Sequence, residues 1–233
     1  MTIPITQDFI PPGRRNRPGL INPMNFITIH NTGNSNRGAN ARAHASYLRG
    51  DVAAGIPVSW HYTVDEGGAF QHLPDNETAF HAGDGSGPGN RQSIGIEICQ
   101  NADGNLLVAT DNAVILCAIL CTRHNISIKN IVQHNRWANK NCPQELRAGR
   151  PYSWDAFIRK VEGLVKELAA PPRPEPEPPK DTGTSEEMTV DNAFKLGIIG
   201  DKAHWLGVIQ GTIAPRPHHV KGLIDNAVRI IRG

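Results

Sequence analysis

The segment Ser93-Ile-Gly-Ile-Glu-Ile-Cys99 decides the fold class. Its isoleucines alternate with small or polar residues, which predicts a β-strand with Ile94, Ile96 and Ile98 on one face. Glu97 then points to the opposite face. A carboxylate in mid-strand is costly to bury without a partner, so Glu97 is a candidate functional residue. The alternative is that Glu97 lies on the solvated outer face of an antiparallel strand.

Further strands and helices alternate on both sides of this segment. Strands are predicted at Asn25–His30, Ser59–Val64, Ala69–Leu73 and Asn130–Gln133, and helices at Ala39–Arg49, Thr110–His124 and Asp155–Leu168. The turn Asp65-Glu-Gly-Gly68 predicts a hairpin. Thr110 or Asp111 is the expected N-cap of the most apolar helix, and Trp137–Arg150 is expected to be irregular. The order predicts an α/β fold, a mixed central β-sheet flanked by helices.

Two histidines and one cysteine are candidate metal ligands. His30 ends a predicted strand, His134 follows a short apolar run, and Cys142 lies eight residues later in a polar loop. Two imidazoles and one thiolate leave a fourth zinc position open, as catalytic zinc sites do. The spacing is not stringent, and each histidine could instead be structural. Alternatively, His134 and Cys142 could form the dyad of a thiol hydrolase.

The other histidines and cysteines carry weaker signals. His81 lies beside the glycine-rich stretch Gly85-Ser-Gly-Pro-Gly89 and could line a cleft. Surface or structural roles are expected for the remaining histidines that precede the linker, which are His44, His61, His72 and His124. Core packing is expected for Cys99, Cys117 and Cys121.

Composition narrows the function classes. The chain has 24 Lys and Arg against 22 Asp and Glu, so its net charge of +2 gives no strong field for nucleic acid. No apolar segment at the N-terminus resembles a secretory signal, and no run of about 18 apolar residues predicts a membrane span. Four cysteines without a CxxC pair do not indicate a disulfide scaffold.

A proline cluster predicts the domain organisation. Residues 171–187 hold six of the 18 prolines and five acidic residues, which predicts an extended linker. It would separate a catalytic domain, residues 1–170, from a small, mainly helical C-terminal module, residues 188–233. That module carries six Lys and Arg against three Asp and Glu, and an amphipathic helix is expected near its end, from Val220 to Ile231.

Five ordered motifs resemble the type 2 N-acetylmuramoyl-L-alanine amidases, a family of phage endolysins and bacterial autolysins related to the peptidoglycan recognition proteins. The motifs are Phe-Ile-Thr-Ile-His30-Asn-Thr, Ser-Trp-His-Tyr62, Ala-Phe-His81-Ala-Gly, Ser-Ile-Gly-Ile-Glu97 and His134 through Lys140-Asn-Cys142-Pro. The resemblance implies that Zn²⁺ is held by His30, His134 and Cys142. It also implies catalytic roles for Glu97 and Lys140.

One position departs from part of this family. Some members place a catalytic tyrosine before the histidine of the second strand, where this chain has Trp60. Because tryptophan cannot accept a proton, acid/base work is expected to rest on Glu97. We expect His81 and Trp60 to line the substrate groove.

The resemblance implies hydrolysis of the amide between N-acetylmuramic acid and L-alanine in bacterial peptidoglycan. A phage endolysin released through a holin is the favoured setting, and a cytoplasmic muropeptide-recycling amidase is the alternative. A non-catalytic peptidoglycan-binding protein is a further alternative. The C-terminal module is expected to bind anionic wall polymers or to form a homo-oligomer.

Overall fold

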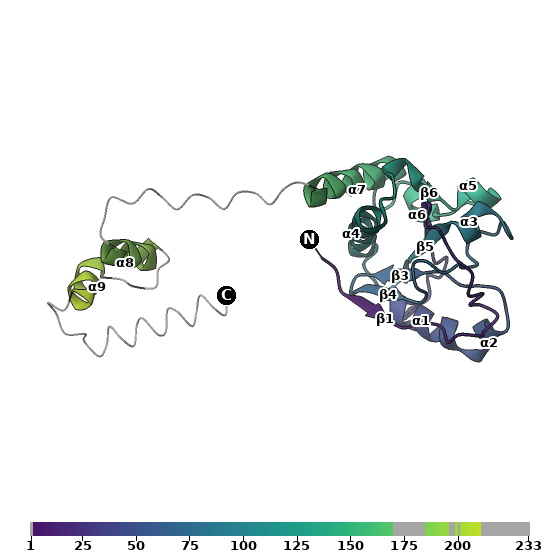
Figure 1. Ribbon diagram of the computed structural model, residues 1–233, viewed down its shortest axis with the longest axis horizontal. Helices are drawn as coiled ribbons and strands as arrows, with labels where there is room; N and C mark the ends of the chain where they lie inside the picture. Colours follow the sequence, from purple (N-terminus) through teal and green to yellow (C-terminus); the bar gives the residue numbers. More distant parts are fainter. Residues whose placement is uncertain (1, 170–184, 196–198, 200, 211–233) are drawn as a thin grey trace. The chain divides into compact units, whose positions relative to one another are not determined.

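The computed structural model describes residues 2–169, 185–195, 199 and 201–210. The chain divides into two compact units, residues 1–171 and 172–233 (Figure 1). In the second unit, two helices are described, α8 (Ser185–Lys195) and α9 (Lys202–Ile209). The side chain of Asp201 caps α9 by accepting a hydrogen bond from the backbone of His204. The helix expected over residues 220–231 and most of the expected linker lie outside the described residues.

Within the described residues, six strands form one mixed sheet in the order β1-β4-β3-β5-β2-β6 (Figure 1). They are β1 (Ile5–Gln7), β2 (Phe26–Asn31), β3 (Tyr62–Asp65), β4 (Gly68–Gln71), β5 (Ser93–Ile98) and β6 (Ile131–Gln133). The hairpin β3–β4 is antiparallel and the other neighbouring pairs are parallel. The predicted mixed sheet is therefore confirmed.

Helices pack around this sheet. They are α1 (Ala41–Arg49), α2 (Asp51–Ala54), α3 (Pro88–Arg91), α4 (Leu106–His124), the 3-10 helix η1 (Ile128–Asn130), α5 (Asn135–Ala138), α6 (Gln144–Arg147) and α7 (Trp154–Ala169). α4 and α7 lie side by side, whereas α1 packs against β3 and β4 (Figure 1).

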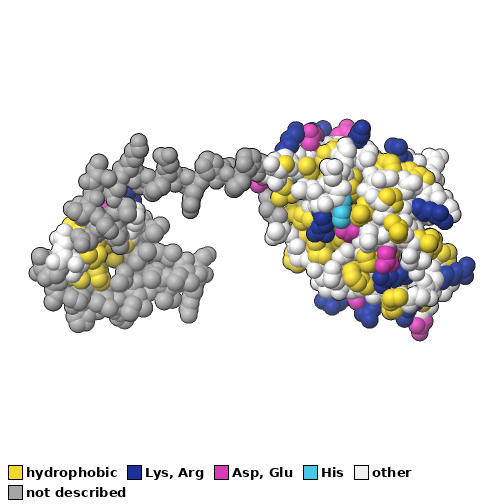
Figure 2. All heavy atoms as spheres, in the orientation of Figure 1, with side chains coloured by type: hydrophobic (Ala, Val, Ile, Leu, Met, Phe, Trp, Pro, Cys, Tyr) yellow, Lys and Arg dark blue, Asp and Glu magenta, His cyan; other side chains and the backbone are white. Residues whose placement is uncertain are grey.

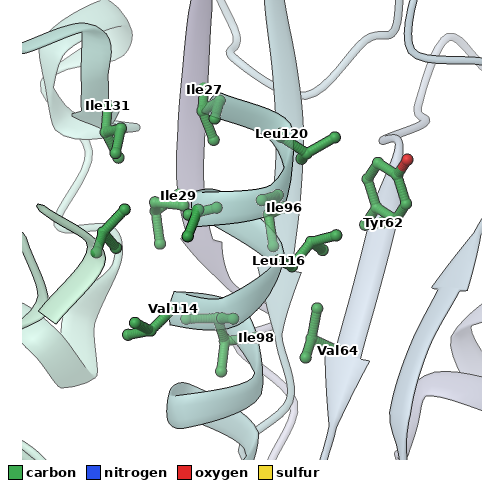
Figure 3. Packing of buried hydrophobic residues seen from close by; sticks show 14 of the residues in the cluster. Ile27, Ile29, Tyr62, Val64, Ile96, Ile98, Val114, Leu116, Leu120 and Ile131 are labelled. Atoms are coloured by element: carbon green, nitrogen blue, oxygen red, sulfur yellow. The ribbon is translucent and has the colours of Figure 1, made fainter. Parts of the chain in front are cut away.

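The main core lies between the sheet and the long helix α4. Ile94, Ile96 and Ile98 of β5 are fully buried there, against residues such as Leu116 and Leu120 of α4 (Figure 3). Each such side chain contributes about 1.5–3 kcal/mol of burial free energy. Because side chains alternate along a strand, Gly95 and Glu97 face the opposite side of the sheet. One face of β5 therefore anchors the fold and the other is available for chemistry.

α4 also satisfies the length and composition expected of a membrane-crossing helix. Half of the most apolar 18-residue segment of α4 is buried inside this unit, where the helix packs against β3, β5 and α7. Asp111 and Asn112 interrupt its apolar residues, and Asp111 accepts hydrogen bonds from Tyr152 and Lys160. These contacts are those of a core helix.

Two local predictions need correction. α4 begins four residues before Thr110, and its N-cap is Asn105, whose side chain accepts a hydrogen bond from the backbone of Val108. The Thr110 hydroxyl instead donates to the Leu106 carbonyl inside the helix. The segment Trp137–Arg150 is not wholly irregular, since it contains the end of α5 and all of α6. Helices of four residues leave too few apolar positions for a readable period.

Candidate metal centre

Three structural elements bring the predicted metal ligands together. His30 lies in β2, His134 directly follows β6 and opens α5, and Cys142 lies in the loop before α6. β2 and β6 are neighbouring parallel strands, and the backbone N–H of His134 donates to the Ile29 carbonyl. A hydrogen bond from the Asn135 N–H to the Cys142 carbonyl holds the Cys142 loop against the start of α5.

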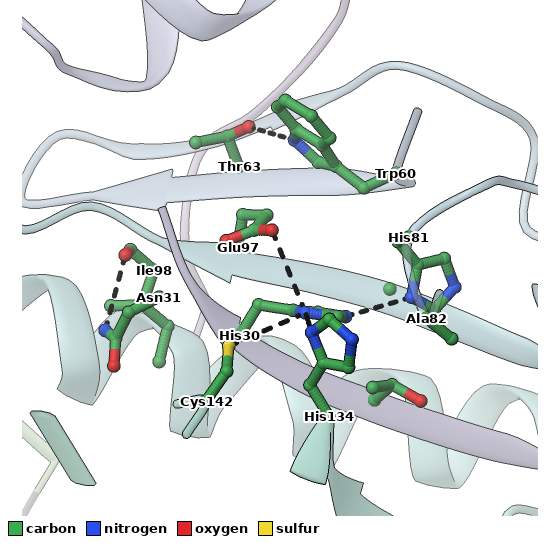
Figure 4. Close-up of polar contacts among 12 residues, drawn as sticks. His30, Asn31, Trp60, Thr63, His81, Ala82, Glu97, Ile98, His134 and Cys142 are labelled. Carbon is green, nitrogen blue, oxygen red and sulfur yellow. Dashed lines mark hydrogen bonds and ion pairs between the residues drawn. The ribbon is translucent and has the colours of Figure 1, made fainter. Parts of the chain in front are cut away.

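The donor atoms of these three residues lie within 4.8 Å of one another (Figure 4). His30 Nδ1 is 3.0 Å from His134 Nδ1 and 3.8 Å from Cys142 Sγ. All three side chains are buried, with relative exposures of 1%, 6% and 2% for His30, His134 and Cys142. Two imidazoles and a thiol converging on one point form a donor set that fits a divalent metal ion with an open position.

Burial is the main reason why the two histidines favour their neutral, ligand-competent forms. Desolvation lowers the pKa of His30 well below its ordinary value, and the neighbouring His81, His134 and Lys140 lower it further. Desolvation, followed by the charge of Lys140, likewise lowers the pKa of His134. Neutral imidazole is the form that binds a metal ion.

Glu97 faces the same centre from the neighbouring strand. β2 and β5 are parallel with His30 opposite Glu97, so both side chains leave the sheet on the same face. Glu97 Oε1 is 3.8 Å from His30 Nδ1, and Glu97 Oε2 is buried without a hydrogen-bond partner among the described residues (Figure 4). Burial raises the pKa of Glu97 to about 8, against an opposing effect of Lys140. β5 is a central parallel strand, so the solvated outer face considered for Glu97 is wrong.

His30, Glu97, His134 and Cys142 line a cavity of about 1080 Å³, and so do the predicted groove residues Trp60 and His81. Lys140, which is exposed, lies on its wall together with Asn141 and Gln144. Pro57, Val58 and Phe80 add an apolar side that was not predicted from the sequence. On the face shown in Figure 2, a histidine side chain reaches the surface between acidic and basic side chains, with hydrophobic side chains around them.

The comparisons with known proteins agree with this geometry. The sequence profile of the N-acetylmuramoyl-L-alanine amidase family matches residues 21–145, more than half of the chain. The chain belongs to this family.

The chain is also similar to individual amidases. It is 50% identical over 159 residues to N-acetylmuramoyl-L-alanine amidase XlyA of Bacillus subtilis (strain 168), which covers 68% of this chain and 51% of XlyA. The chain therefore spans about half the length of that relative. The solved catalytic domain of XlyA superposes with a TM-score of 0.64 at 49% identity, covering 68% of this chain and 99% of that domain. A solved mutant endolysin from Bacillus subtilis superposes with a TM-score of 0.64 at 48% identity, covering 69% of this chain and 99% of that structure.

Trp60, the departure from the tyrosine of some amidases, lines the cavity but has no free polar group. Its indole N–H donates to Thr63 Oγ1 at 2.6 Å, and Thr63 Oγ1 lies 2.8 Å from His72 Nε2. The ring packs in a small apolar cluster with Leu48 and Leu73. Trp60 can therefore offer the cavity an aromatic surface but no proton acceptor.

His81 lines the cavity as expected, but its side chain is largely buried and contacts His30. Its Nδ1 is 2.9 Å from His30 Nε2, and the His81 side chain is 9% exposed (Figure 4). The histidines expected to be structural lie apart from the donor set. His61 bonds to the backbone of Glu77 and Gly95, and His124 Nε2 lies 2.7 Å from Asp75 Oδ2.

The geometry disfavours the thiol hydrolase alternative for this amidase family member. Burial and the nearby Glu97 raise the pKa of Cys142 to about 11, which is the opposite of what a nucleophilic thiolate requires. Cys142 Sγ lies 3.8 Å from His30 Nδ1, so the thiol is a member of the three-residue donor set and not of a separate pair with His134. A bound cation, by contrast, would stabilise the thiolate form directly.

Proposed function

We propose that this chain is a zinc-dependent amidase that cleaves the bond between N-acetylmuramic acid and L-alanine in bacterial peptidoglycan. The observation that carries the proposal is the buried His30, His134 and Cys142 donor set with the unpaired Glu97 Oε2 beside it. Membership in the amidase family and the similarity to XlyA supply the reaction class.

In this proposal Zn²⁺ is held by His30, His134 and Cys142. When bound, the ion supplies Lewis acidity, which polarises a carbonyl oxygen and makes water more acidic. The same donor set supports other divalent ions, and zinc is preferred because thiolate and imidazole are ligands that it commonly takes in proteins.

Glu97 is the proposed general base and acid. It accepts a proton from the attacking water and returns that proton to the leaving amine of L-alanine. Its largely buried position, 15% exposed, and its raised pKa suit a group that must carry a proton through part of the cycle. Trp60 cannot share this task, because its only polar hydrogen is bonded to Thr63.

Lys140 is the proposed source of positive charge for the oxyanion. The charge of Lys140 lowers the pKa values of Glu97, His30 and His134, which supports a role near the reacting centre. A preorganised cation near developing negative charge lowers the barrier without reorganising solvent. The apolar wall formed by Pro57, Val58 and Phe80 would exclude water from one side of the substrate.

The test is digestion of purified cell walls followed by identification of the new chain ends. Cleavage should release new L-alanine N-termini and no new reducing sugar ends. Glu97→Gln should lower kcat by about 10²- to 10⁴-fold, because the amide cannot relay the proton. Its matched control is Glu66→Gln in the exposed β3–β4 turn, which should keep the parental rate. Normal cleavage by Glu97→Gln, or reducing sugar ends as the product, would contradict the proposal.

A non-catalytic wall-binding protein is the competing function, and the same assay separates the two. A pure binder would sediment with walls yet release no L-alanine ends at any Zn²⁺ concentration. The retained donor set and the adjacent unpaired carboxylate favour the enzyme.

We also propose an endolysin-type role, in which the chain lyses the host wall and the C-terminal module, residues 188–233, binds anionic wall polymers. The similarity to the solved Bacillus subtilis endolysin supports the first part. The six basic against three acidic residues of residues 188–233 support the second. Binding of the full chain to teichoic-acid-containing walls should weaken with salt and fall on walls stripped of those polymers. Concentration-dependent self-association without such binding would favour an oligomerisation module instead.

A further inference from the structure

We propose that His81 is a positioning residue for the metal ligand His30, not a contact for substrate. It would hold the His30 ring by accepting its Nε2–H, so that His30 Nδ1 stays directed at the metal. The inference rests on the metal centre proposed above and is independent of which bond the enzyme cuts.

The direction of the His30–His81 hydrogen bond follows from the metal centre. His30 Nδ1 is the atom nearest to His134 Nδ1, Cys142 Sγ and Glu97 Oε1, so it is the ligand atom. A neutral imidazole that binds metal through Nδ1 carries its hydrogen on Nε2. His30 Nε2 therefore donates across 2.9 Å, and His81 Nδ1 accepts.

A chain of hydroxyl groups behind His81 is consistent with this tautomer. When His81 Nδ1 accepts, its hydrogen is on Nε2, and Nε2 lies 3.4 Å from Ser93 Oγ. Ser93 Oγ donates its own hydrogen to the Gly89 carbonyl at 2.6 Å, so it can only accept from its other neighbours. Thr28 Oγ1 donates to Ser93 Oγ at 2.8 Å and accepts from the Trp137 indole N–H at 2.9 Å. Each polar hydrogen in this series of hydrogen bonds, from His30 to Trp137, therefore has one acceptor.

The His81 ring is also fixed sterically and through its backbone. Gly95 of β5 lies directly under it, and a Cβ added at Gly95 would come within 2.7–2.8 Å of three ring atoms. The backbone N–H groups of His81 and Ala82 both donate to Asn90 Oδ1, at 2.8 and 2.7 Å. His81 lines the cavity, but both of its ring nitrogens have protein partners, so no polar atom of the ring is left for substrate. Partners of this kind set the orientation and basicity of a metal-bound imidazole.

The test compares Zn²⁺ affinity in two variants by competition with a chromogenic chelator. His81→Phe keeps a ring but removes the acceptor, and His81→Asn places Oδ1 near the former position of Nδ1. We expect His81→Phe to weaken Zn²⁺ binding by about 10- to 100-fold and His81→Asn to recover most of that loss. Thermal unfolding of each metal-free variant reports whether it folds, so that lost affinity is compared among folded proteins.

His124→Asn is the matched control. His124 is a partly buried histidine of α4 that pairs with Asp75, so its replacement can cost stability but should leave Zn²⁺ affinity unchanged. Parental affinity in His81→Phe would overturn the proposal, and so would equal losses in His81→Phe and His81→Asn. A raised KM with unchanged Zn²⁺ affinity would overturn it in favour of a substrate contact. A parental protein that binds no Zn²⁺ would refute the metal centre itself.

Discussion

Gly95→Ala tests how tightly the strand face and His81 are packed. The added Cβ would lie 2.7 Å from His81 Cγ and 2.8 Å from Cδ2 and Nδ1, closer than real Cβ contacts occur. The ring is not the end of a flexible chain, because its nitrogens and backbone are bonded to His30, Ser93 and Asn90. Overpacking of this kind costs about 1–3 kcal/mol. Replacing a strand glycine returns about 0.5–1 kcal/mol of backbone entropy. Taking the middle of both ranges, the net loss of stability should be about 1 kcal/mol.

The assay is urea unfolding of the metal-free protein, with Gly163→Ala as the control. Gly163 lies in α7 with nothing within 4 Å of an added Cβ, so this change should stabilise by up to about 1 kcal/mol. Gly95→Ala should also weaken Zn²⁺ binding, because the displaced His81 ring releases His30. Removing the ring in Gly95→Ala/His81→Ala should relieve part of the clash, which a double-mutant cycle measures. A Gly95→Ala protein as stable as the parent would refute the rigid packing on which this reasoning depends.

Three further outcomes are expected. Phe157 of α7 is fully buried and stacked on Trp154, so Phe157→Ala should lower the free energy of unfolding by about 3–5 kcal/mol. The measurement is a lower urea midpoint at constant m. A loss below about 1 kcal/mol would show that the surrounding core collapses into the space left by the ring. Burial lowers the pKa of His72 from 6.5 to about 3. Below pH 6.5 the unfolded chain takes up a proton on His72 that the folded chain does not, so the free energy of unfolding is highest above pH 6.5 and decreases as the pH falls. This one residue should account for about 2 kcal/mol of lost stability between pH 7 and pH 5, and His72→Leu should have a shallower pH dependence by that amount; an identical slope would contradict the assignment. Chelation should abolish wall cleavage and lower the Tm, and Zn²⁺ at 100 times its Kd should restore about 2.7 kcal/mol; full activity after chelation would exclude the metal proposal.

Much of the fold was predictable because its central elements have strong local patterns. The alternation in Ser93–Cys99 and the β-branched run ending at His30 correspond to β5 and β2, and the helical period corresponds to α7. β1 was not predicted, because three residues beside Pro4 carry no readable period and pair with β4 more than 60 residues away. The N-cap of α4 was misplaced because Thr110 has the chemistry of a cap but lies inside the helix.

Local sequence patterns also limited what could be predicted about the candidate site: they indicated the residue types but not the cavity wall or the side-chain orientations. His30, Glu97, His134 and Cys142 were recognisable as residue types in an ordered set of motifs. The apolar cavity wall at Val58 and Phe80 was missed, because single apolar residues in loops have no periodic pattern. His81 was singled out, but its orientation toward His30 depends on hydrogen bonds between residues 51 positions apart.

The sequence by itself determined most of the longer strands and helices, the two faces of the central strand and the set of chemically competent side chains. These depend on the two-residue period of a strand and on the chemistry of each residue. The tertiary structure alone decided that β2 and β5 pair in the register that sets His30 opposite Glu97. It also decided that the His81 ring packs directly against Gly95, where a side chain would clash with it. A register shift by one residue would reverse the face of every side chain on β5, so the metal centre is a consequence of strand pairing that no local segment encodes.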